Sequence, residues 1–344
     1  MRIVILYGGE SDERDLSLAS GTAVAEVLLE RGDQVTLVDP LYGAFPVKSE
    51  SDLPRVDLTM DPRDIREIPE RRRCLEVLTS PEVVEEMRRA DLVFVTLTGG
   101  WGGDGHIQAV LDMMEVRYTC AGPAAASHAL DKTVTRRLLH SSGVPVAPAV
   151  ATTQKRSPAE LRAGVAALLR DGPVVVKPVR GGGSLHVKLV RTLGELDTVL
   201  ASSSGDLLFE SYLPGREFTV GIIGDQVLPI IEITPADALY GYEDKRLPGL
   251  DARECPARLT EPEARTLRAL ALAAHHAIGL DQHTCSRVDF RCDRFGVPHC
   301  LEVNAHPGLT PVSMFPHAAR AAGLTFPDLI TKIIELTHPA PTRP

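Results

Sequence analysis

Three oxygen-bearing side chains near the C-terminal end of the chain could hold a metal ion. Asp289 lies in the alternating stretch "RVDFRCD", and Glu302 and Asn304 lie two positions apart in the later stretch "PHCLEVN". Residues two apart on a strand point to one face, and Gly296 between the stretches is typical of a hairpin turn. All three side chains can therefore gather on one face of a two-stranded ribbon. Carboxylates held this close repel each other unless a positive charge lies between them, so the spacing indicates a cation site.

A glycine-rich loop in the middle of the chain could bind phosphates. The segment "KPVRGGGSLHV" lacks the P-loop pattern, and the residues after its glycines are β-rich, so it does not fit the dinucleotide fingerprint either. It predicts a glycine hairpin between two strands. Backbone N–H groups of such a hairpin can approach phosphates closely, Ser184 can add a donor, and Lys177 can add a point charge. The alternative for the loop taken alone is a surface hairpin whose lysine extends into solvent.

Two glutamates in "LLFESYLPGREF" could serve a nucleotide. Glu210 ends an apolar run, and Glu217 follows a short linker before the next β-rich stretch. A purine needs a backbone donor and acceptor at such a hinge, and a ribose needs a carboxylate for its hydroxyl groups. Either glutamate taken alone is better explained as a solvated surface charge.

Composition limits the class of protein. The chain has 344 residues, of which 44% are hydrophobic and 24% charged, as in a soluble globular protein with two or three lobes. It has no run of 18 apolar residues, and "MRIVILYGGE" predicts a first strand rather than a signal peptide. The net charge of −9 argues against a general nucleic-acid binder, although a local cationic pocket could still take an anion. We therefore expect neither a nucleic acid nor a membrane as a partner.

The six cysteines are typical of ordinary thiols. None of them forms a C-x-x-C pair, and they are too sparse for a disulfide scaffold. We expect reduced thiols and a cytoplasmic location.

Strands alternate with helices in the first third of the chain. The expected strands are "RIVILYGG", "QVTLVDP" and "DLVFVTLTGG", and the expected helices are "LSLASGTAVAEVLLERG", "EVVEEMRRA" and "GHIQAVLDMMEV". This order predicts a parallel sheet covered on both faces, with ligands at the carboxyl ends of its strands. Those ends are the polar, glycine-rich segments "YGGESDERD" and "LTGGWGGDG".

The pattern changes after about residue 122. One helix is expected over "ASHALDKTVTRRLLHSSGV" and another over "SPAELRAGVAALLRDG", where Ser157 is the N-cap. Strands follow on both sides of the glycine loop, a helix opens at Thr260 with capping-box spacing, and a last helix lies near "FPDLITKIIELT". We predict an α/β chain with α+β lobes at residues 1–122, 123–214 and 215–344.

Taken together and in this order, the motifs resemble the ATP-grasp superfamily and, within it, the D-alanine–D-alanine ligase family. The segments that carry the resemblance span nearly the whole chain: "GGESDERDLSLASG", "GGDGHIQAVLDMMEVRYT", "LDKTVTRRLL", "VVVKPVRGGGS", "FESYLPGREFTV", "YGYEDKR", "RVDF" and "LEVNAHPGLTPVSM". The resemblance implies a three-lobed ATP-grasp fold. Its N-terminal lobe would be a parallel α/β domain, and ATP would lie between two β-rich lobes.

The resemblance also implies the residues that bind ATP and Mg²⁺. The phosphates would contact Lys132 and Lys177, with Ser184 in the lid over them. The adenine hinge and the ribose site would be formed by Glu210, Tyr212, Leu213 and Glu217. Two Mg²⁺ ions, for which Mn²⁺ can substitute, would be held by Asp289, Glu302 and Asn304. Magnesium prefers such oxygen ligands together with substrate phosphates.

The remaining residues implied by the resemblance act on two small amino-acid-like substrates. The carboxylate of the first would attack the γ-phosphate to give an acyl phosphate and ADP, and the amine of the second would then displace phosphate. Arg287 and the Gly308 N–H would stabilise the oxyanion of that second step. Glu13 would bind the first ammonium group, and Lys245 and Ser313 the second carboxylate. Family members are often dimers, so a homodimer is compatible with the resemblance.

Several positions near the amino-acid substrates depart from the family pattern. Gly183 replaces the first of two adjacent serines, Arg246 replaces a tyrosine, and Thr98 replaces a histidine. Trp101 interrupts the second glycine segment, which would place it near the first substrate. His306 stands beside the oxyanion loop in "NAHPGL".

These departures favour a ligase with altered substrates, in which Arg246 and His306 help to bind them. Because several hydrogen-bonding partners change together, neutral drift is the weaker explanation. The motifs are also compatible with a genuine D-alanine–D-alanine ligase of peptidoglycan synthesis and with a non-catalytic ATP-binding regulator. Retention of Arg287 and the three metal-site residues argues against the regulator. A carboxylase-type ATP-grasp enzyme is a further alternative, but this sequence shows no sign of a biotin or coenzyme A site. The sequence leaves open the identity and chirality of the substrates and whether the acceptor atom is nitrogen or oxygen.

Overall fold

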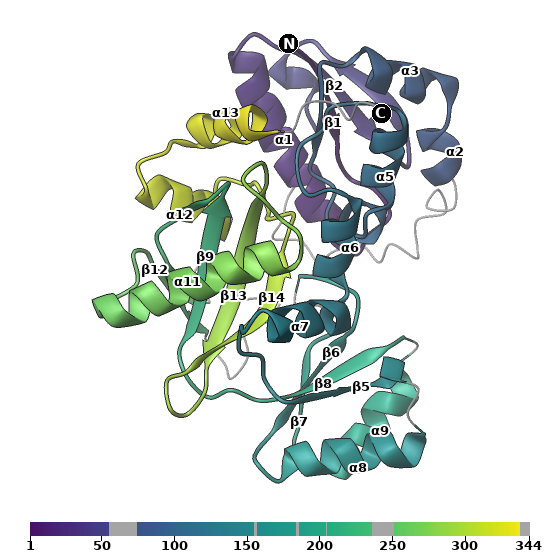
Figure 1. Cartoon of the computed structure of the whole chain (residues 1–344). Coiled ribbons are helices and arrows are strands. Elements are labelled where there is room, and N and C mark those ends of the chain that lie inside the picture. Colours follow the sequence, from purple (N-terminus) through teal and green to yellow (C-terminus); the bar gives the residue numbers. More distant parts are fainter. Residues whose placement is uncertain (55–73, 155–156, 184–185, 204, 236–250, 338–344) are drawn as a thin grey trace.

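Three β-sheets form the framework of the molecule. The structure, a computed structural model, describes residues 1–54, 74–154, 157–183, 186–203, 205–235 and 251–337. Within these residues one sheet lies in the N-terminal part, one in the middle part and one in the C-terminal part of the chain (Figure 1). Each sheet falls within one of the ranges that we propose as lobes.

The N-terminal sheet has the predicted parallel strands. Its order is β3-β2-β1-β4, with β1 (Arg2–Leu6), β2 (Gln34–Asp39) and β4 (Leu92–Val95) parallel. Ile3 to Leu6 are fully buried because helices cover both faces of the sheet. The helices of this part are α1 (Arg14–Glu30), α2 (Cys74–Leu78), α3 (Pro81–Arg89), α4 (Gly100–Gly103) and α5 (His106–Met113), with a 3₁₀ turn η1 (Glu50–Asp52). The sequence analysis missed β3 (Gly43–Val47), an antiparallel edge strand whose Pro46 is tolerated there.

The expected single helix over "ASHALDKTVTRRLLHSSGV" is wrong. The segment forms two helices, α6 (Pro123–Leu130) and α7 (Lys132–Ser141), which are separated at Asp131. Asp131 has a non-helical backbone, and its carboxylate accepts hydrogen bonds from the Thr133 and Val134 N–H groups as the N-cap of α7. The break makes Lys132 the first residue of a helix.

The middle sheet contains the glycine hairpin, as predicted. Its order is β5 (Ala149–Ala151), β8 (Leu207–Ser211), β6 (Val174–Pro178) and β7 (Lys188–Val190), and β6 and β7 are antiparallel on either side of the glycines. This part also holds η4 (Thr152–Gln154), α8 (Pro158–Leu169) and α9 (Leu193–Ser202). The Ser157–Glu160 capping box begins α8 at the predicted residue.

The C-terminal sheet carries the hairpin of the metal-site residues. Its order is β12 (Asp251–Glu254), β11 (Ile231–Pro235), β9 (Glu217–Ile223), β13 (Cys285–Cys292) and β14 (Pro298–Asn304), with β10 (Gln226–Val227) beside β9. Helix α11 (Glu261–Ala277) packs against one face, and α12 (Met314–Ala321) and α13 (Phe326–Leu336) follow. Helix α13 also packs against α1, so the C-terminal and N-terminal parts share one hydrophobic core (Figure 1).

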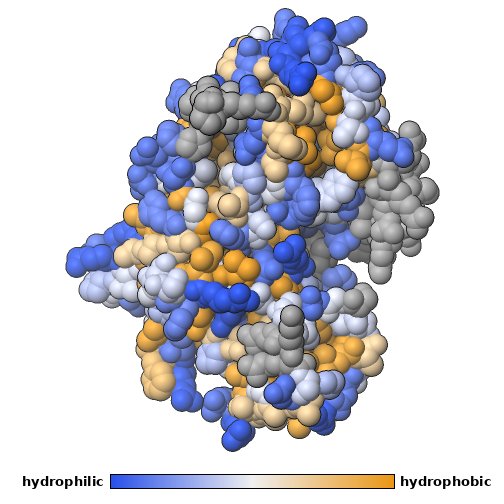
Figure 2. Space-filling view, turned by 45° about the vertical axis from the view of Figure 1, so that its right-hand side comes forward, coloured by the Kyte–Doolittle hydropathy of each residue, from blue (hydrophilic) through white to orange (hydrophobic). Residues whose placement is uncertain are grey.

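Apolar residues on the outer surface lie in scattered positions between hydrophilic ones on the face shown in Figure 2. None of the helices in the described part of the chain is long and apolar enough to cross a membrane.

Candidate active site

Asp289 and Glu302 face each other across the predicted hairpin. They are directly paired residues of β13 and β14, and Arg287 is paired with Asn304 on the same two strands. The Arg287 guanidinium donates hydrogen bonds from Nε and Nη2 to Asp289 at 2.8 and 2.7 Å, and its Nη2 lies 3.5 Å from Glu302 Oε1. Thr219 on β9 donates a third hydrogen bond to Asp289 at 2.6 Å. The three predicted metal-site residues therefore lie together, with Arg287 offsetting part of their charge.

The donor set fits a divalent cation that also binds phosphate oxygens. Two carboxylates and an amide provide hard oxygen donors, as Mg²⁺ prefers. Asn304 Oδ1 accepts a hydrogen bond from the His306 N–H at 2.9 Å, which fixes the amide and leaves its second lone pair for a ligand. No cluster of three His, Cys, Asp or Glu side chains in the described residues forms a complete metal cage. A bound nucleotide would therefore have to supply part of the coordination shell.

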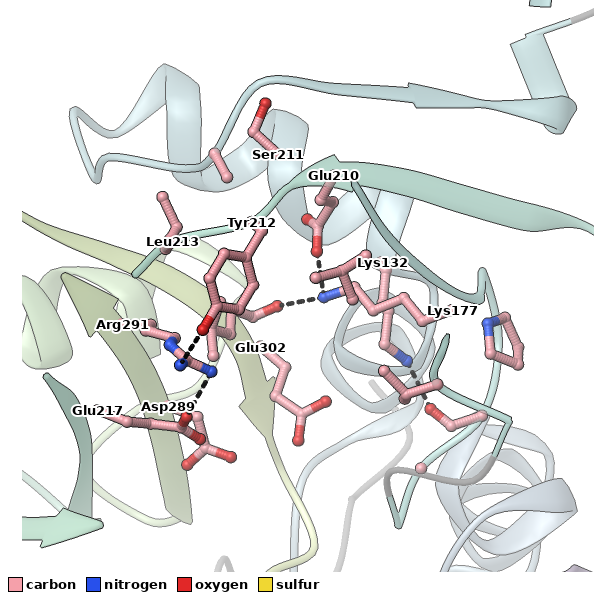
Figure 3. Close-up of a pocket in the computed structure, with 17 residues that line it drawn as sticks. Lys132, Lys177, Glu210, Ser211, Tyr212, Leu213, Glu217, Asp289, Arg291 and Glu302 are labelled. Atoms are coloured by element: carbon pink, nitrogen blue, oxygen red, sulfur yellow. Dashed lines mark hydrogen bonds and ion pairs between the residues drawn. The ribbon is translucent and has the colours of Figure 1, made fainter. Parts of the chain in front are cut away.

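Lys177 and Glu210 form a buried ion pair at the end of the middle sheet. Lys177 Nζ lies 2.5 Å from Glu210 Oε2 (Figure 3). Arg136 of α7 donates a hydrogen bond to the other carboxylate oxygen. The Glu210 side chain is buried, with an exposed fraction of 5%. Pairing with two cations compensates the cost of burying this carboxylate. The sequence analysis missed Arg136, which lies four residues after Lys132 and so on the same face of α7.

The segment after Glu210 has the backbone features of an adenine hinge. The N–H groups of Ser211 and Tyr212 donate to the carbonyls of Pro148 and Pro173 at 2.9 and 3.0 Å. The next N–H, that of Leu213, has no partner among the described residues. Leu213 lines the first cavity, so this N–H is a backbone donor that a ligand there could use.

Glu217 lies beside an arginine that the sequence analysis did not single out. Arg291 Nη1 lies 3.2 Å from Glu217 Oε2, and Arg291 Nη2 donates to the Tyr212 hydroxyl at 3.0 Å (Figure 3). The guanidinium also lies 4.9 Å from the centre of the Tyr212 ring. The signal was present in "RVDFR", because Arg287, Asp289 and Arg291 alternate along β13 and share one face.

Lys132 lies at the N-terminus of α7 and under the glycine loop. Its Nζ donates to the Gly181 carbonyl at 2.6 Å, and its backbone N–H donates to the Val179 carbonyl at 3.0 Å. Burial lowers the pKa of the Lys132 ammonium, with Lys177 adding to the shift and Glu302 opposing it. An anion between the two lysines would relieve both effects, because it attracts both charges.

Two cavities meet at these residues. The first has a volume of about 110 Å³ and is lined by Lys132, Lys177, Glu210, Tyr212, Leu213, Glu217, Asp289, Arg291 and Glu302 among others (Figure 3). The second has a volume of about 330 Å³ and is lined by Glu13, Thr98, Lys132, Arg253, Arg287, Glu302, Asn304, His306, Gly308 and Ser313 among others. Lys132, Glu302, Gly181 and Gly182 line both cavities. A group that spans their junction would contact a lysine, a carboxylate and the glycine loop at once.

Comparison with known proteins agrees with this arrangement. Residues 2–121 match the model of the D-ala D-ala ligase N-terminus, and residues 138–335 match that of the D-ala D-ala ligase C-terminus. The D-alanine–D-alanine ligases of Anaeromyxobacter dehalogenans strain 2CP-C and Anaeromyxobacter sp. strain K are each 36% identical to this chain. Each alignment covers 97% of this chain and 96% of the relative. This chain belongs to the D-alanine–D-alanine ligase family.

Solved structures of the family have the same fold. The D-alanine–D-alanine ligase of Bacillus anthracis, 25% identical, superposes with a TM-score of 0.74 over 98% of this chain and 97% of its own. Its complex with ATP gives a TM-score of 0.73 at 23% identity, with the same coverage. The VanG D-Ala:D-Ser ligase of Enterococcus faecalis, 22% identical, also gives 0.73, over 97% of this chain and 98% of its own. The predicted ATP-grasp fold is confirmed, and the protein is an ATP-dependent, ADP-forming ligase.

In this ligase the glycine loop lies directly against Glu13. A Cβ atom added at Gly182 would lie 2.3 Å from Glu13 Oε2, and one at Gly183 would lie 3.2 Å from Glu13 Oε1. Gly183 also has a φ of +65°, which favours glycine. The Glu13 carboxylate thus takes up the space beside the loop that a side chain at position 183 would need.

The remaining predicted substrate residues divide into three groups. Glu13, Arg287, His306, Gly308 and Ser313 line the 330 Å³ cavity together. Ser184, Lys245 and Arg246 lie outside the described residues. Trp101, which was expected near the first substrate, does not line the 330 Å³ cavity. It lines a small cavity that shares Thr98 and Gly99 with it, and its half-buried ring packs against the core of the N-terminal part.

The sequence analysis missed two further polar residues of this cavity region. Arg253 of β12 lines the cavity, and its Nη1 donates to the Val312 carbonyl at 3.2 Å. Gln108 of α5 lies 3.2 Å from His306, and burial lowers the pKa of His306 to about 4, so this histidine is neutral near pH 7. Gln108 had no sequence signal, because a polar residue in an amphipathic helix is usually exposed.

Proposed function

We propose that this ligase joins two D-amino acids through an acyl phosphate. The observation that carries the proposal is the junction of the two cavities at Lys132 and Glu302. With ATP in the smaller cavity, its γ-phosphate would lie at this junction, next to a carboxylate held in the larger one. Attack by that carboxylate oxygen on the γ-phosphorus releases ADP and leaves an acyl phosphate.

The residues of this chain have the following roles in the proposal. Lys132 and Lys177 bind the phosphates, Leu213 donates its N–H to the adenine, and Glu217 accepts the ribose hydroxyls. Asp289, Glu302 and Asn304 would hold Mg²⁺ ions, which neutralise phosphate charge when bound. The described glycines of the loop exclude water from the acyl phosphate, with Ser184 as a proposed further donor.

The second step takes place in the larger cavity. The amine of the second substrate attacks the acyl carbon, phosphate leaves with the oxygen of the former carboxylate, and one proton is released. Arg287 and the Gly308 N–H stabilise the oxyanion, and Glu13 binds the ammonium of the first substrate. Ser313, the N-cap of α12, binds the second carboxylate at the positive end of that helix, together with Lys245.

D-Alanine is the first candidate for both substrates, because relatives that are 36% identical over nearly the whole chain carry the name D-alanine–D-alanine ligase. The test is ADP release by the purified protein with ATP, Mg²⁺ and a panel of D- and L-amino acids and hydroxy acids. Faster ADP release with D-alanine as the single added amino acid than with any other acid of the panel supports this candidate. Absence of ADP release with every member of the panel would reject the proposed function.

A second candidate is an acceptor with an additional acidic group. Arg253 lines the cavity and donates to the carbonyl of Val312, the residue directly before Ser313. Arg246 stands where the family has a tyrosine. An arginine carries a permanent charge and suits a carboxylate. Arg246→Tyr should then lower activity with the acidic acceptor about tenfold or more, the scale of one charged hydrogen bond, and should leave D-alanine kinetics unchanged or improved. If wild type prefers D-alanine and the substitution changes nothing, this candidate is rejected. We also propose that the protein is cytoplasmic and that it forms a homodimer.

A further inference from the structure

His306 is held by a buried glutamine from another part of the chain. Gln108 of α5 is fully buried, and its Nε2 donates to the Gly102 carbonyl at 2.7 Å. The same nitrogen lies 3.2 Å from His306 Nε2. The contact therefore joins a helix of the N-terminal sheet to the loop that follows β14.

This pair determines which nitrogen of the imidazole carries the proton. The Gly102 carbonyl can only accept, so the Gln108 amide must turn its NH₂ group toward it. That NH₂ group then also faces His306 Nε2, which must accept and so cannot carry a proton. The Gln108 Oε1 atom is buried and has no hydrogen-bond partner among the residues that the structure describes. Flipping the amide would place Oε1 against a carbonyl oxygen, so the orientation is retained although Oε1 is unsatisfied.

The other ring nitrogen is consequently a donor. His306 is one of the residues that line the 330 Å³ cavity, together with Arg287 and Gly308. Among the described residues, Gln108 is the one side chain that bonds to this ring, so Nδ1–H has no partner there. His306 is also close in sequence to the proposed oxyanion donor, since it lies two residues before Gly308.

We propose that His306 donates a hydrogen bond from Nδ1 to a carbonyl or carboxylate oxygen of a substrate in this cavity, and that Gln108 is the positioning residue that fixes this tautomer. The inference rests on the proposed function, because it requires a substrate with such an oxygen. Arg287 and the Gly308 N–H supply charge and one donor, and His306 supplies a further neutral donor.

Two substitutions of His306 distinguish the roles of its two ring nitrogens. The amide of His306→Asn places an N–H near the position of Nδ1, and the longer amide of His306→Gln reaches the position of Nε2. With D-alanine, ATP and Mg²⁺, we expect kcat/KM to fall about tenfold or more in His306→Gln and to fall clearly less in His306→Asn, since one hydrogen bond to a substrate is lost in the first and kept in the second. The reverse order, an equal loss in both, or no loss in either would overturn the donor role.

A second histidine provides the matched control. His128 of α6 makes one hydrogen-bond contact through its Nδ1, 3.0 Å from the Ile278 carbonyl, and lines neither cavity. His128→Asn and His128→Gln should leave kcat/KM unchanged. Thermal unfolding of all four variants checks that each is folded under the assay conditions.

The tautomer can be measured without turnover. In protein labelled with ¹⁵N-histidine, the resonances lost in His306→Asn belong to His306. We expect them to show a protonated Nδ1 and a bare Nε2. In Gln108→Glu the ionised carboxylate can only accept, so we expect the proton to lie on Nε2 there. A protonated Nε2 in wild type would overturn the inference whatever the activity. If wild type releases no ADP with D-alanine or with any member of the panel, the proposed function is rejected. The proposed hydrogen bond from His306 to a substrate is then rejected as well, even if the tautomer is as expected.

Discussion

At the scale of single residues, the site depends on charged groups that are buried but paired. Asp289 and Glu302 are held face to face on neighbouring strands, and Arg287 bonds to one and lies close to the other. Removal of one member of such a set leaves the others without compensation, which is why we expect single substitutions here to have large effects.

Glu302 offers the clearest test of the metal site. Glu302→Gln keeps the shape of the side chain and removes one negative charge from the proposed Mg²⁺ ligands. We expect turnover to fall at least about a hundredfold, because phosphoryl transfer depends on charge neutralisation by the metal. ADP release at saturating ATP and Mg²⁺ measures the effect, and an unchanged thermal unfolding midpoint shows that the fold is kept. An unchanged rate would mean that these oxygens do not hold the metals.

Gly182 tests the contact between the glycine loop and Glu13. A Cβ at this position would lie 2.3 Å from Glu13 Oε2, so Gly182→Ala must displace either the loop or the carboxylate. We expect kcat/KM to fall about tenfold or more, because a small misplacement of a positioning group is costly in catalysis. Gly205→Ala is the matched control, since an added Cβ meets nothing within 4 Å there. Equal activity of the two variants would show that the loop does not need to approach Glu13.

At the scale of secondary-structure elements, polar contacts hold the helices and strands of the site in place. Asp131 ends α6, caps α7 and so places Lys132 at a helix N-terminus. His275 links α11 to β13, because its Nδ1 lies 2.8 Å from Ser286 Oγ and its Nε2 lies 3.2 Å from the Asp281 carbonyl. Ser286 directly precedes Arg287, so this contact supports the strand that carries the site.

His275 makes stability depend on pH. Burial lowers its pKa from 6.5 to about 4, so between these values the unfolded chain binds more protons than the folded one. The free energy of unfolding should therefore fall as pH drops below 6.5, by up to about 3 kcal/mol once pH is below 4. Denaturant unfolding across this range should show a smaller pH dependence in His275→Gln, while the exposed His140→Gln should keep that of wild type. An identical pH dependence in His275→Gln and wild type would contradict this role.

At the scale of the whole molecule, all three sheets contribute to the two cavities. Glu13 comes from the end of the N-terminal sheet, Lys177 from the middle sheet, and Asp289 and Glu302 from the C-terminal sheet. The N-terminal and C-terminal sheets share one hydrophobic core and the middle sheet has its own, and the polar groups collect where the sheets meet. This explains why residues more than 100 positions apart in sequence form one site.

The sequence predicted the parts of this arrangement that have local signals. Alternation in "RVDF" and "LEVN" predicted a shared face for the metal-site residues. The N-cap at Ser157 and the capping-box spacing at Thr260 predicted where α8 and α11 begin. Contacts between distant segments had no such signal, so Arg136, Gln108 and Arg253 were missed. The break at Asp131 was missed because the apolar spacing continues through it and the cap depends on the actual backbone angle.

If the reaction passes through an acyl phosphate, one carboxylate oxygen of the first substrate is transferred to the released phosphate, and this transfer can be measured. D-Alanine labelled with ¹⁸O in its carboxylate is incubated with the protein, ATP and Mg²⁺, and the released phosphate is analysed by mass spectrometry. We expect ADP as the nucleotide product and one ¹⁸O atom in each phosphate, because the attacking carboxylate oxygen leaves with the phosphorus. Release of AMP and pyrophosphate, or phosphate without ¹⁸O alongside amide product, would contradict it.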